Sequence, residues 1–187
     1  MGQLTFEEAE IWSVAHTDQG YAVLIKPIGI EVAVPIFVGQ SEAQSILIGM
    51  GDIPMPKPNS HDLLLSAISL SGSNIKKIEI TELVDGIFDS AIYFNNINGE
   101  QKLEARPSDS IALAVRAECK IFISEAVVKE TGVSLEIIKN KTGKLNSEYE
   151  KEKAELKNQL DLAVVQENYE KAANLRDKLK KLEQNFF

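Results

Sequence analysis

The feature that most constrains this chain is the stretch 104–116, in which a strand end, a polar corner and an apolar helix follow one another. Pro107 disfavours a helical conformation at the residue before it, so Arg106 should be extended. Ser108 is then a suitable helix N-cap, because its hydroxyl can accept from free backbone N–H groups. Asp109 would lie in the first turn, where the helix dipole stabilises a negative charge. The sequence therefore predicts a strand-to-helix corner at Pro107.

This corner places charged side chains at the edge of a hydrophobic core. Residues 111–115 are apolar without a gap, which predicts a helix that is covered on most sides. Glu104, Arg106 and Asp109 should therefore form an ionic cluster at one corner of that core. One interpretation is a buried clamp between Arg106 and the carboxylates that fixes the corner, because structural ion networks also gather such groups. The other interpretation is that these groups take part in catalysis.

Length and composition indicate a globular domain with an appended segment. The chain has 187 residues, of which 44% are hydrophobic and 26% are charged. Residues 1–145 contain 12 Lys and Arg against 19 Asp and Glu, a net charge of −7, and residues 146–187 contain 8 against 9, a net charge of −1. An acidic body is unfavourable for non-specific binding of nucleic acid, which depends on Lys and Arg.

Cysteine usage and hydropathy predict a cytoplasmic protein. Cys119 is the only cysteine, so the chain cannot form an internal disulfide, which is typical of proteins in a reducing cytosol. The sequence shows no basic segment followed by an apolar run, the pattern of a signal peptide, and no apolar run approaches the length of a membrane span. We therefore expect no association with a membrane.

Hydrophobic periodicity and turn residues predict an α+β fold with a mainly antiparallel sheet and short helices. The expected strands are 20–25, 31–38, 75–83, 87–94, 101–105 and 121–123. The expected helices are 41–50, one that starts at Asn59 or Ser60 and runs through Ser71, 124–131 and the one that follows Ser108. Asp85-Gly86 is a strong hairpin turn between two of these strands. Two segments leave alternatives open: residues 4–16 form a strand or a helix, and residues 134–138 form a last strand or a helical turn.

Two of the expected strand–helix units resemble each other. The runs 41–46 and 108–113 both open with Ser, an acidic residue and a small residue, and both follow an extended segment. Ser41 would cap the first helix as Ser108 caps the second. We interpret this pattern as an internal duplication of a strand–helix unit, and the alternative is two ordinary helix N-termini.

The composition changes at Asn146, after which neither Gly nor Pro occurs. The polar residues 141–145 before it are interpreted as a linker that follows a domain at 1–140. In residues 146–187 apolar residues recur three and four positions apart, the seam typical of helices that pair. Asn168 can cap a second helix, so we expect a helical hairpin. A hairpin of this size buries too little apolar surface to be stable alone and should pack against the body or another chain.

The dipeptide His61-Asp62 is a second candidate for chemistry. It follows a loop with three prolines and would begin a helix, and a loop that leads into a helix N-terminus is a suitable place for an anion. In a functional interpretation, His61 is a general acid or base and Asp62 is a metal ligand. In a structural interpretation, His61 caps the helix and Asp62 is a first-turn acid. Hard cations prefer clustered oxygens, which Asp62, Glu104 and Asp109 would supply if the two corners meet in space.

The stretch Ala105–Ala114 resembles the signature of the bifunctional nuclease domain family, Ala-Arg-Pro-Ser-Asp-Ala-Ile-Ala-Leu-Ala, with Ser110 in place of the second small residue. The stretch Pro56–Leu64 is similar to a second segment of that family, Arg-Pro-x-Thr-His-Asp-Leu-Leu, with Lys57 and Ser60 in place of Arg and Thr. The resemblance covers roughly residues 10–140.

This resemblance implies a metal-assisted nuclease that acts on DNA and RNA without strong sequence preference. Asp62, Glu104 and Asp109 would then be ligands of Mg²⁺ or Mn²⁺, which would stabilise charge on the scissile phosphate and activate water. His61 would be the general acid or base, and Arg106 would bind the phosphate. The alternative is a non-catalytic adaptor, in which the body is a scaffold and the C-terminal hairpin makes the contact.

The C-terminal segment resembles a second module, the UVR motif of excision-repair nuclease subunits and of some Clp-unfoldase partners. The run Tyr169–Asp177 follows its pattern, and that module is a protein–protein contact element. The resemblance implies a protein partner for residues 146–187. The apolar stripe from Tyr169 to Phe186, which includes Leu175, Leu179 and Leu182, should not stay exposed, because burying one Leu is worth roughly 2 kcal/mol. We therefore expect a homo-oligomer, most simply a dimer.

Overall fold

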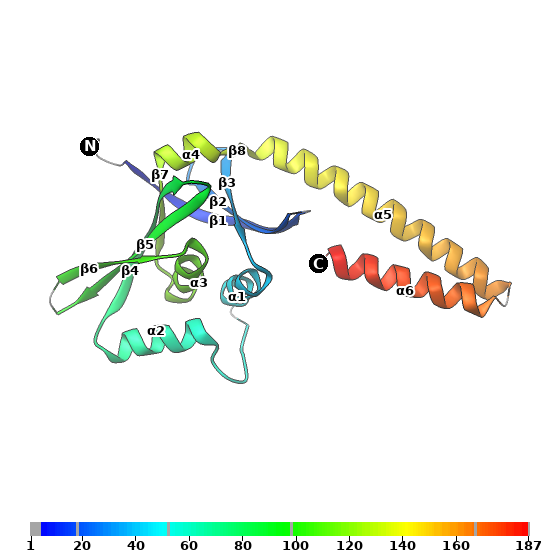
Figure 1. The fold of residues 1–187 in the computed structure, drawn as a ribbon, viewed down its shortest axis with the longest axis horizontal. Coiled ribbons are helices and arrows are strands. Elements are labelled where there is room, and N and C mark those ends of the chain that lie inside the picture. Colours follow the sequence, from blue (N-terminus) through cyan, green and yellow to red (C-terminus); the bar gives the residue numbers. More distant parts are fainter. Residues whose placement is uncertain (1–4, 18, 52, 98, 167, 187) are drawn as a thin grey trace. The chain divides into compact units, whose positions relative to one another are not determined.

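The computed structural model describes residues 5–17, 19–51, 53–97, 99–166 and 168–186. The chain divides into two compact units, Met1–Leu135 and Glu136–Phe187. The first unit is an α+β body and the second is a helical hairpin, which confirms the predicted fold class (Figure 1). Among the described residues, no helix is both long enough and apolar enough to cross a membrane.

The body is built on one sheet of eight strands, which is mainly antiparallel. The strands are β1 Phe6–Thr17, β2 Gly20–Pro27, β3 Val32–Val38, β4 Asn74–Val84, β5 Ile87–Asn96, β6 Gly99–Ala105, β7 Lys120–Ser124 and β8 Val133–Ser134. Their order across the sheet is β6-β5-β4-β7-β1-β2-β3-β8, and only the β4–β7 pair is parallel among the strands described. The segment 4–16, which the sequence left open, is therefore a strand where it is described, and the last strand is two residues long.

Four helices belong to the body: α1 Gln40–Met50, α2 Ser60–Leu70, α3 Pro107–Ala117 and α4 Glu125–Thr131. α3 packs against α1 and α2 on one side and against β4, β5 and β7 on the other (Figure 1). Its buried face includes Ile111, Ala112, Leu113 and Ala114, which are at most 1% exposed. The predicted covered helix is confirmed: α3 lies between the sheet and helices α1 and α2, which also contact β2 and β4 directly.

The local turn chemistry follows the sequence closely. Asp85 and Gly86 both have positive φ, 51° and 80°, as a two-residue hairpin turn of this type requires. Asn59 caps α2 with a complete capping box, in which its side chain accepts from backbone N–H groups and Asp62 accepts from the backbone N–H of Asn59. Arg106 is extended, with φ −67° and ψ 146°, as expected before a proline.

The predicted caps Ser108 and Ser41 are wrong. α3 begins at Pro107, because proline is favoured at the first helical position, where its missing N–H and fixed φ cost nothing. Arg106 is thus the N-cap residue, and Ser108 lies buried in the first turn. α1 begins at Gln40 with Gly39 as its N-cap residue, and the Ser41 hydroxyl donates to the Glu42 carboxylate at 2.9 Å.

The two strand–helix units that resemble each other in sequence also occupy equivalent places in the fold. Three consecutive antiparallel strands precede each helix, β1–β3 before α1 and β4–β6 before α3. Glu42 and Asp109 both hold the third helical position of an 11-residue helix. This agreement supports the interpretation as an internal duplication, and it places two acidic side chains at matching helix N-termini.

The second unit consists of α5, which runs Leu135–Val165, and α6, which runs Tyr169–Phe186. Asn168 caps α6 by accepting from the backbone N–H of Lys171 at 3.1 Å, as predicted. Within the hairpin Ala163, Ala172 and Leu175 form a small buried cluster, against which Leu156 and Leu160 pack. The side chains of Leu182 and Phe186, which belong to the predicted stripe, lie outside the described residues.

Residues 141–145, which the sequence analysis interprets as a linker, lie within the continuous helix α5. The stretch 136–151 contains eight strong helix formers that outweigh the single Gly143: Glu136, Lys139, Lys141, Lys144, Leu145, Glu148, Glu150 and Lys151. For residues 134–138 the sequence left a strand or a helical turn open. The structure contains both, because residues 133–134 form the short strand β8 and helix α5 starts at the next residue.

The C-terminus of α3 provides a stability test. Glu118 adopts a left-handed conformation, φ 50° and ψ 35°, at the position where glycine is most common. Replacing it with glycine removes this strain, so Glu118→Gly should raise the free energy of unfolding by about 1 kcal/mol in urea titrations. Glu118→Ala is the matched control, because it removes the charge and keeps the strain. An equal gain in both variants would contradict the backbone explanation.

Candidate functional site

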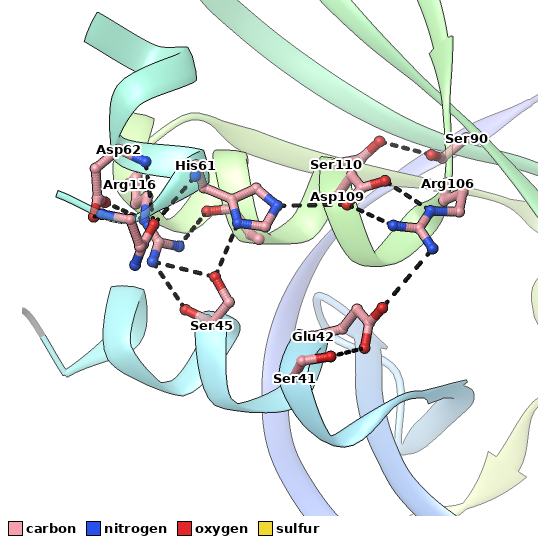
Figure 2. A network of polar contacts seen from close by, with 12 residues as sticks. Ser41, Glu42, Ser45, His61, Asp62, Ser90, Arg106, Asp109, Ser110 and Arg116 are labelled. Atoms are coloured by element: carbon pink, nitrogen blue, oxygen red, sulfur yellow. Dashed lines mark hydrogen bonds and ion pairs between the residues drawn. The ribbon is translucent and has the colours of Figure 1, made fainter.

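A continuous network of polar side chains joins α1, α2 and α3 (Figure 2). Residues three or seven positions apart share one face of a helix, so α1 presents Glu42 together with Ser45, and α3 presents Asp109 together with Arg116. We define the site network as Glu42, Ser45, His61, Asp62, Arg106, Asp109 and Arg116. It therefore brings together side chains from positions 42 to 116 of the sequence.

Arg106 forms the exposed end of the network. Its Nε donates to Asp109 Oδ2 at 2.8 Å and its Nη2 donates to Oδ1 at 3.1 Å, a two-pronged contact. Its Nη1 lies 3.8 Å from Glu42 Oε1, and the side chain remains 68% exposed. Burial alone would raise the pKa of the Asp109 carboxyl, but the hydrogen bonds and charges of Arg106 and His61 hold it below its ordinary value. Asp109 is therefore ionised at neutral pH.

His61 is held at both ring nitrogens. Its Nδ1 lies 2.9 Å from Ser45 Oγ, and its Nε2 lies 3.5 Å from Asp109 Oδ1. A carboxylate can only accept, so we assign a hydrogen to Nε2. Arg116 Nη2 donates to Ser45 Oγ at 3.4 Å, which leaves the hydroxyl hydrogen for Nδ1 of a neutral ring. The same hydroxyl oxygen can accept from a cationic ring, so Ser45 supports both protonation states of His61.

The buried end of the network is an ion pair between Asp62 and Arg116. Arg116 is only 6% exposed, and its Nε donates to Asp62 Oδ1 at 2.5 Å. The other oxygen, Oδ2, accepts from the backbone N–H of Asn59 at 2.9 Å. Burial would raise the pKa of the Asp62 carboxyl, but these two donors hold it below its ordinary value. Asp62 is therefore a structural link that ties the start of α2 to α3.

A cavity lies at each end of the site network. The first, of about 660 Å³, is lined by Glu42, Arg106 and Glu104 of β6, among other residues. The second, of about 960 Å³, is lined by Asp62 and Arg116 together with apolar side chains of α1 and α2. The first cavity is lined by the exposed guanidinium of Arg106, so it is the more suitable of the two cavities for an anionic ligand.

Comparison with known proteins identifies the family. Residues 23–136 match the family described as the bifunctional nuclease domain, which is more than half of the chain. The chain belongs to the bifunctional nuclease domain family. Residues 150–185 match the UvrB/uvrC motif, and this confirms both resemblances noted in the sequence.

Curated relatives of this bifunctional nuclease domain come from bacteria and plants. An uncharacterized protein of Mycobacterium tuberculosis is 38% identical over 100 residues, which cover 53% of this chain and 58% of the relative. The protein named bifunctional nuclease 1 of Oryza sativa subsp. japonica is 22% identical over 178 residues, 85% of this chain and 54% of the relative. Bifunctional nuclease 2 of Arabidopsis thaliana is 20% identical over 174 residues, which cover 83% of this chain and 53% of the relative. The chain thus spans about half the length of the relatives it matches.

The structure brings the candidate residues His61, Arg106 and Asp109 together, which the sequence left open, but it leaves Glu104 outside the network. Ala105 pairs with Ser90, whose hydroxyl contacts Ser110 of α3 at 2.7 Å. Successive residues of a strand point to opposite faces, so Glu104 points away from the face that α3 covers. It lines the first cavity, and no described contact joins it to Asp109.

The predicted carboxylate set for Mg²⁺ or Mn²⁺ is not formed. Among the described residues, no group of three or more His, Cys, Asp and Glu side chains is arranged to hold a metal ion. Two of the three predicted ligands, Asp62 and Asp109, are engaged by arginines, and the third, Glu104, lies on the other side of the strand. The donor set in this arrangement therefore does not fit a divalent cation.

Three members of the network were not proposed from the sequence as functional residues: Glu42, Ser45 and Arg116. The likeness of the runs 41–43 and 108–110 could have identified Glu42, because it places this acid at the same helical position as Asp109. Arg116 lies seven residues after Asp109, which predicts a shared helix face. Ser45 carried no such signal, since its role depends on how α1 packs on α2.

The Asp62–Arg116 pair allows a test of stability against pH. Asp62→Asn leaves one of two donors without an acceptor and should lower the free energy of unfolding at pH 7 by roughly 2 kcal/mol, after a discount for the partial exposure of Asp62. Because folding lowers the pKa of Asp62 from its ordinary 3.8, its contribution is complete above about pH 4 and is lost as pH falls further. The difference between wild type and variant should therefore shrink in acid.

Urea unfolding between pH 3 and pH 7 would measure this difference. Asp177→Asn is a suitable control, because Asp177 pairs with Arg176 at 3.0 Å on the exposed surface of α6. Its loss should change the free energy of unfolding by less than about 0.5 kcal/mol at either pH. A difference for Asp62→Asn that is independent of pH would show that the carboxylate charge is not what stabilises this corner.

Proposed function

We propose that the body hydrolyses phosphodiester bonds of nucleic acids at the site formed by Arg106, Asp109 and His61. The observation that carries the proposal is the exposed guanidinium of Arg106 beside an imidazole that is held at both ring nitrogens. Membership of the bifunctional nuclease domain family supports the reaction class.

Arg106 would bind a phosphate of the substrate. Its planar guanidinium matches two phosphate oxygens, and it stands at the N-terminus of α3, where the helix dipole favours an anion. The contact to Glu42 at 3.8 Å is long, so a phosphate could replace it while Asp109 continues to hold the guanidinium. The cavity of about 660 Å³ beside Arg106 has room for a nucleotide unit.

His61 would transfer the proton. In its cationic form the ring carries hydrogens on both nitrogens, Nδ1–H donates to Ser45, and Asp109 stabilises the positive charge. Water attacks the phosphorus, the bond to the leaving oxygen breaks, and that oxygen receives the Nε2 proton of His61. The attacking water releases one proton to the solvent, and His61 takes up a proton again before the next turnover. The 3.5 Å separation of Nε2 from Asp109 leaves this hydrogen available to a bound substrate.

No step of this proposal passes through Mg²⁺ or Mn²⁺, because the residues do not form a ligand set. The family resemblance nevertheless predicts a metal, so metal dependence remains a separate prediction. It is measured directly when the assay contains either ion or a chelator.

We further propose that residues 150–185 provide a protein contact. The match to the UvrB/uvrC motif supports this role, and so do Leu162, Val164 and Tyr169, which are 50–69% exposed around the turn between α5 and α6. Exposed apolar side chains at a hairpin tip are suited to a protein surface. In the adaptor alternative this contact would be the whole function.

The test of the nuclease proposal is hydrolysis of single-stranded DNA and RNA by highly purified protein. His61→Ala should lower kcat by roughly 100-fold or more, since general acid catalysis contributes at least that factor. Arg106→Lys keeps the charge and loses the two-pronged fit, so it should raise KM more than it lowers kcat. Asp109→Asn should impair both steps, because Asp109 contacts both residues.

The second histidine of the chain provides a matched control. His16 is exposed on β1, far along the sequence from the network, and packs edge-on against Tyr21 at 4.8 Å between ring centres. His16→Ala should retain the wild-type rate. If His61→Ala and Asp109→Asn also retain full activity, the hydrolysis comes from a contaminant or from another site, and the adaptor alternative gains support.

A further inference from the structure

Helix α2 has apolar side chains on two opposite faces. On the inner face, Leu65 and Ile68 pack against the core of the body. On the outer face, Leu63, Ala67 and Leu70 follow the i, i+4, i+7 spacing of a single stripe, and Leu63 and Leu70 are 56% and 88% exposed. A helix that is apolar all round is normally covered on all sides. Within the part of the body that the structure describes, this outer stripe has no cover.

Further apolar side chains are exposed on α1, on the loop that leads to α2 and on α2 itself. Leu47, Met50, Ile53, Met55 and Leu64 are between 43% and 51% exposed. We define the α2 surface as Leu47, Met50, Ile53, Met55, Leu63, Leu64, Ala67 and Leu70. With roughly 100 Å² of apolar surface for each large side chain when fully exposed, the α2 surface presents on the order of 400 Å². That is close to the apolar part of one side of an interface of standard size, about 800 Å² per partner.

The absence of charge on the outer stripe of α2 favours one kind of binding partner, a second copy of the chain. Residues 63–75 contain no charged side chain, although the whole chain has a net charge of −8. Asp62 borders the stripe but is engaged by Arg116. Two copies of an acidic body repel each other except where such an uncharged surface meets its equivalent. A basic partner protein would find no acid on the stripe, and an anionic membrane would find no row of Lys and Arg.

We propose that a second copy of this chain covers the α2 surface, so that two α2 helices pair across a two-fold axis. Such an interface is isologous, with each stripe packing against its own equivalent. The pairing locates self-association on the body, whereas the sequence had suggested the hairpin for this role. The pairing would also hold the site network in place. α2 carries His61 and Asp62, and in a single copy it contains no buried residue of its own.

Sedimentation velocity of the full chain tests this proposal. Wild type should sediment as a dimer at micromolar concentration. Leu63→Glu and Leu70→Glu should each shift the chain to a monomer, because two carboxylates would face each other across the axis. Both side chains are exposed in a single copy, so the circular dichroism of the monomers should not change. Ile97→Glu is the control: Ile97 is 96% exposed in the β5–β6 turn, outside the α2 surface, and its variant should remain a dimer.

A second comparison separates this surface from the hairpin. The double variant Leu162→Glu/Tyr169→Glu alters the exposed residues near the turn of the second unit and should remain a dimer. A monomeric wild type would overturn the proposal, and so would dimers that persist in both α2 variants. Dissociation by the hairpin variant alone would place the interface on residues 150–185 and would equally overturn it.

A chemical cross-link gives an independent readout if a glutamate variant is poorly soluble. Ala67→Cys places a thiol in the middle of the stripe, and a short bismaleimide should convert the full chain to covalent dimers. The native Cys119 competes poorly, because burial raises the pKa of its thiol to about 11. A variant that remains uncross-linked, as the wild type does under the same conditions, would contradict pairing at α2. None of these readouts depends on nuclease activity.

Discussion

The buried guanidinium of Arg116 is the interaction on which the arrangement of the three helices depends. It donates to the carboxylate of Asp62, to the carbonyl of Ala112, and to the carbonyl and hydroxyl of Ser45. A charge that is only 6% exposed is tolerated because these acceptors replace water. Gly49 makes the close approach of α1 feasible, since a Cβ there would lie 2.6 Å from Val115 Cγ2 and 2.8 Å from Arg116 Nη1. One cation therefore fixes α1, α2 and α3 relative to one another.

Ser45 connects Arg116 to His61, and beyond His61 the charges alternate along the network toward the surface. The neutral or cationic ring of His61 is followed by Asp109, then by Arg106, then by Glu42. Under the proposed function, a phosphate would compete with Glu42 for the guanidinium of Arg106, so affinity for single anions should be modest. This arrangement suits an acidic body, because the site presents one positive group at a defined position instead of a broad basic surface. Under the proposed function, this arrangement would favour selective placement of a phosphate over non-specific adhesion to polyanions.

The sequence predicted those parts of the fold and site that depend on neighbouring residues. The extended Arg106, the Asp85-Gly86 turn and the Asn168 cap each follow from local backbone preferences. The pair Asp62–Arg116 joins residues 54 positions apart, and no periodicity specifies which helices will meet. Glu104 could not be placed for a different reason. It lies only five residues before Asp109 in the sequence, but the face of the sheet to which its side chain points depends on the register between β5 and β6, in which Ser90 pairs with Ala105.

The proposed duplication suggests how such a site can arise from two similar units. At the N-cap position the first unit has Gly39 and the second has Arg106, while both have an acid three residues later. A Cβ at Gly39 would lie 2.4 Å from Oε2 of Glu42, so the glycine leaves room for this carboxylate to turn back over the start of its own helix. Packing α1 beside α3 then brings the acid of one unit to the cation of the other. The asymmetry at this single position places one guanidinium between two carboxylates. Neither unit could build that arrangement alone, because each supplies only one of the two acids.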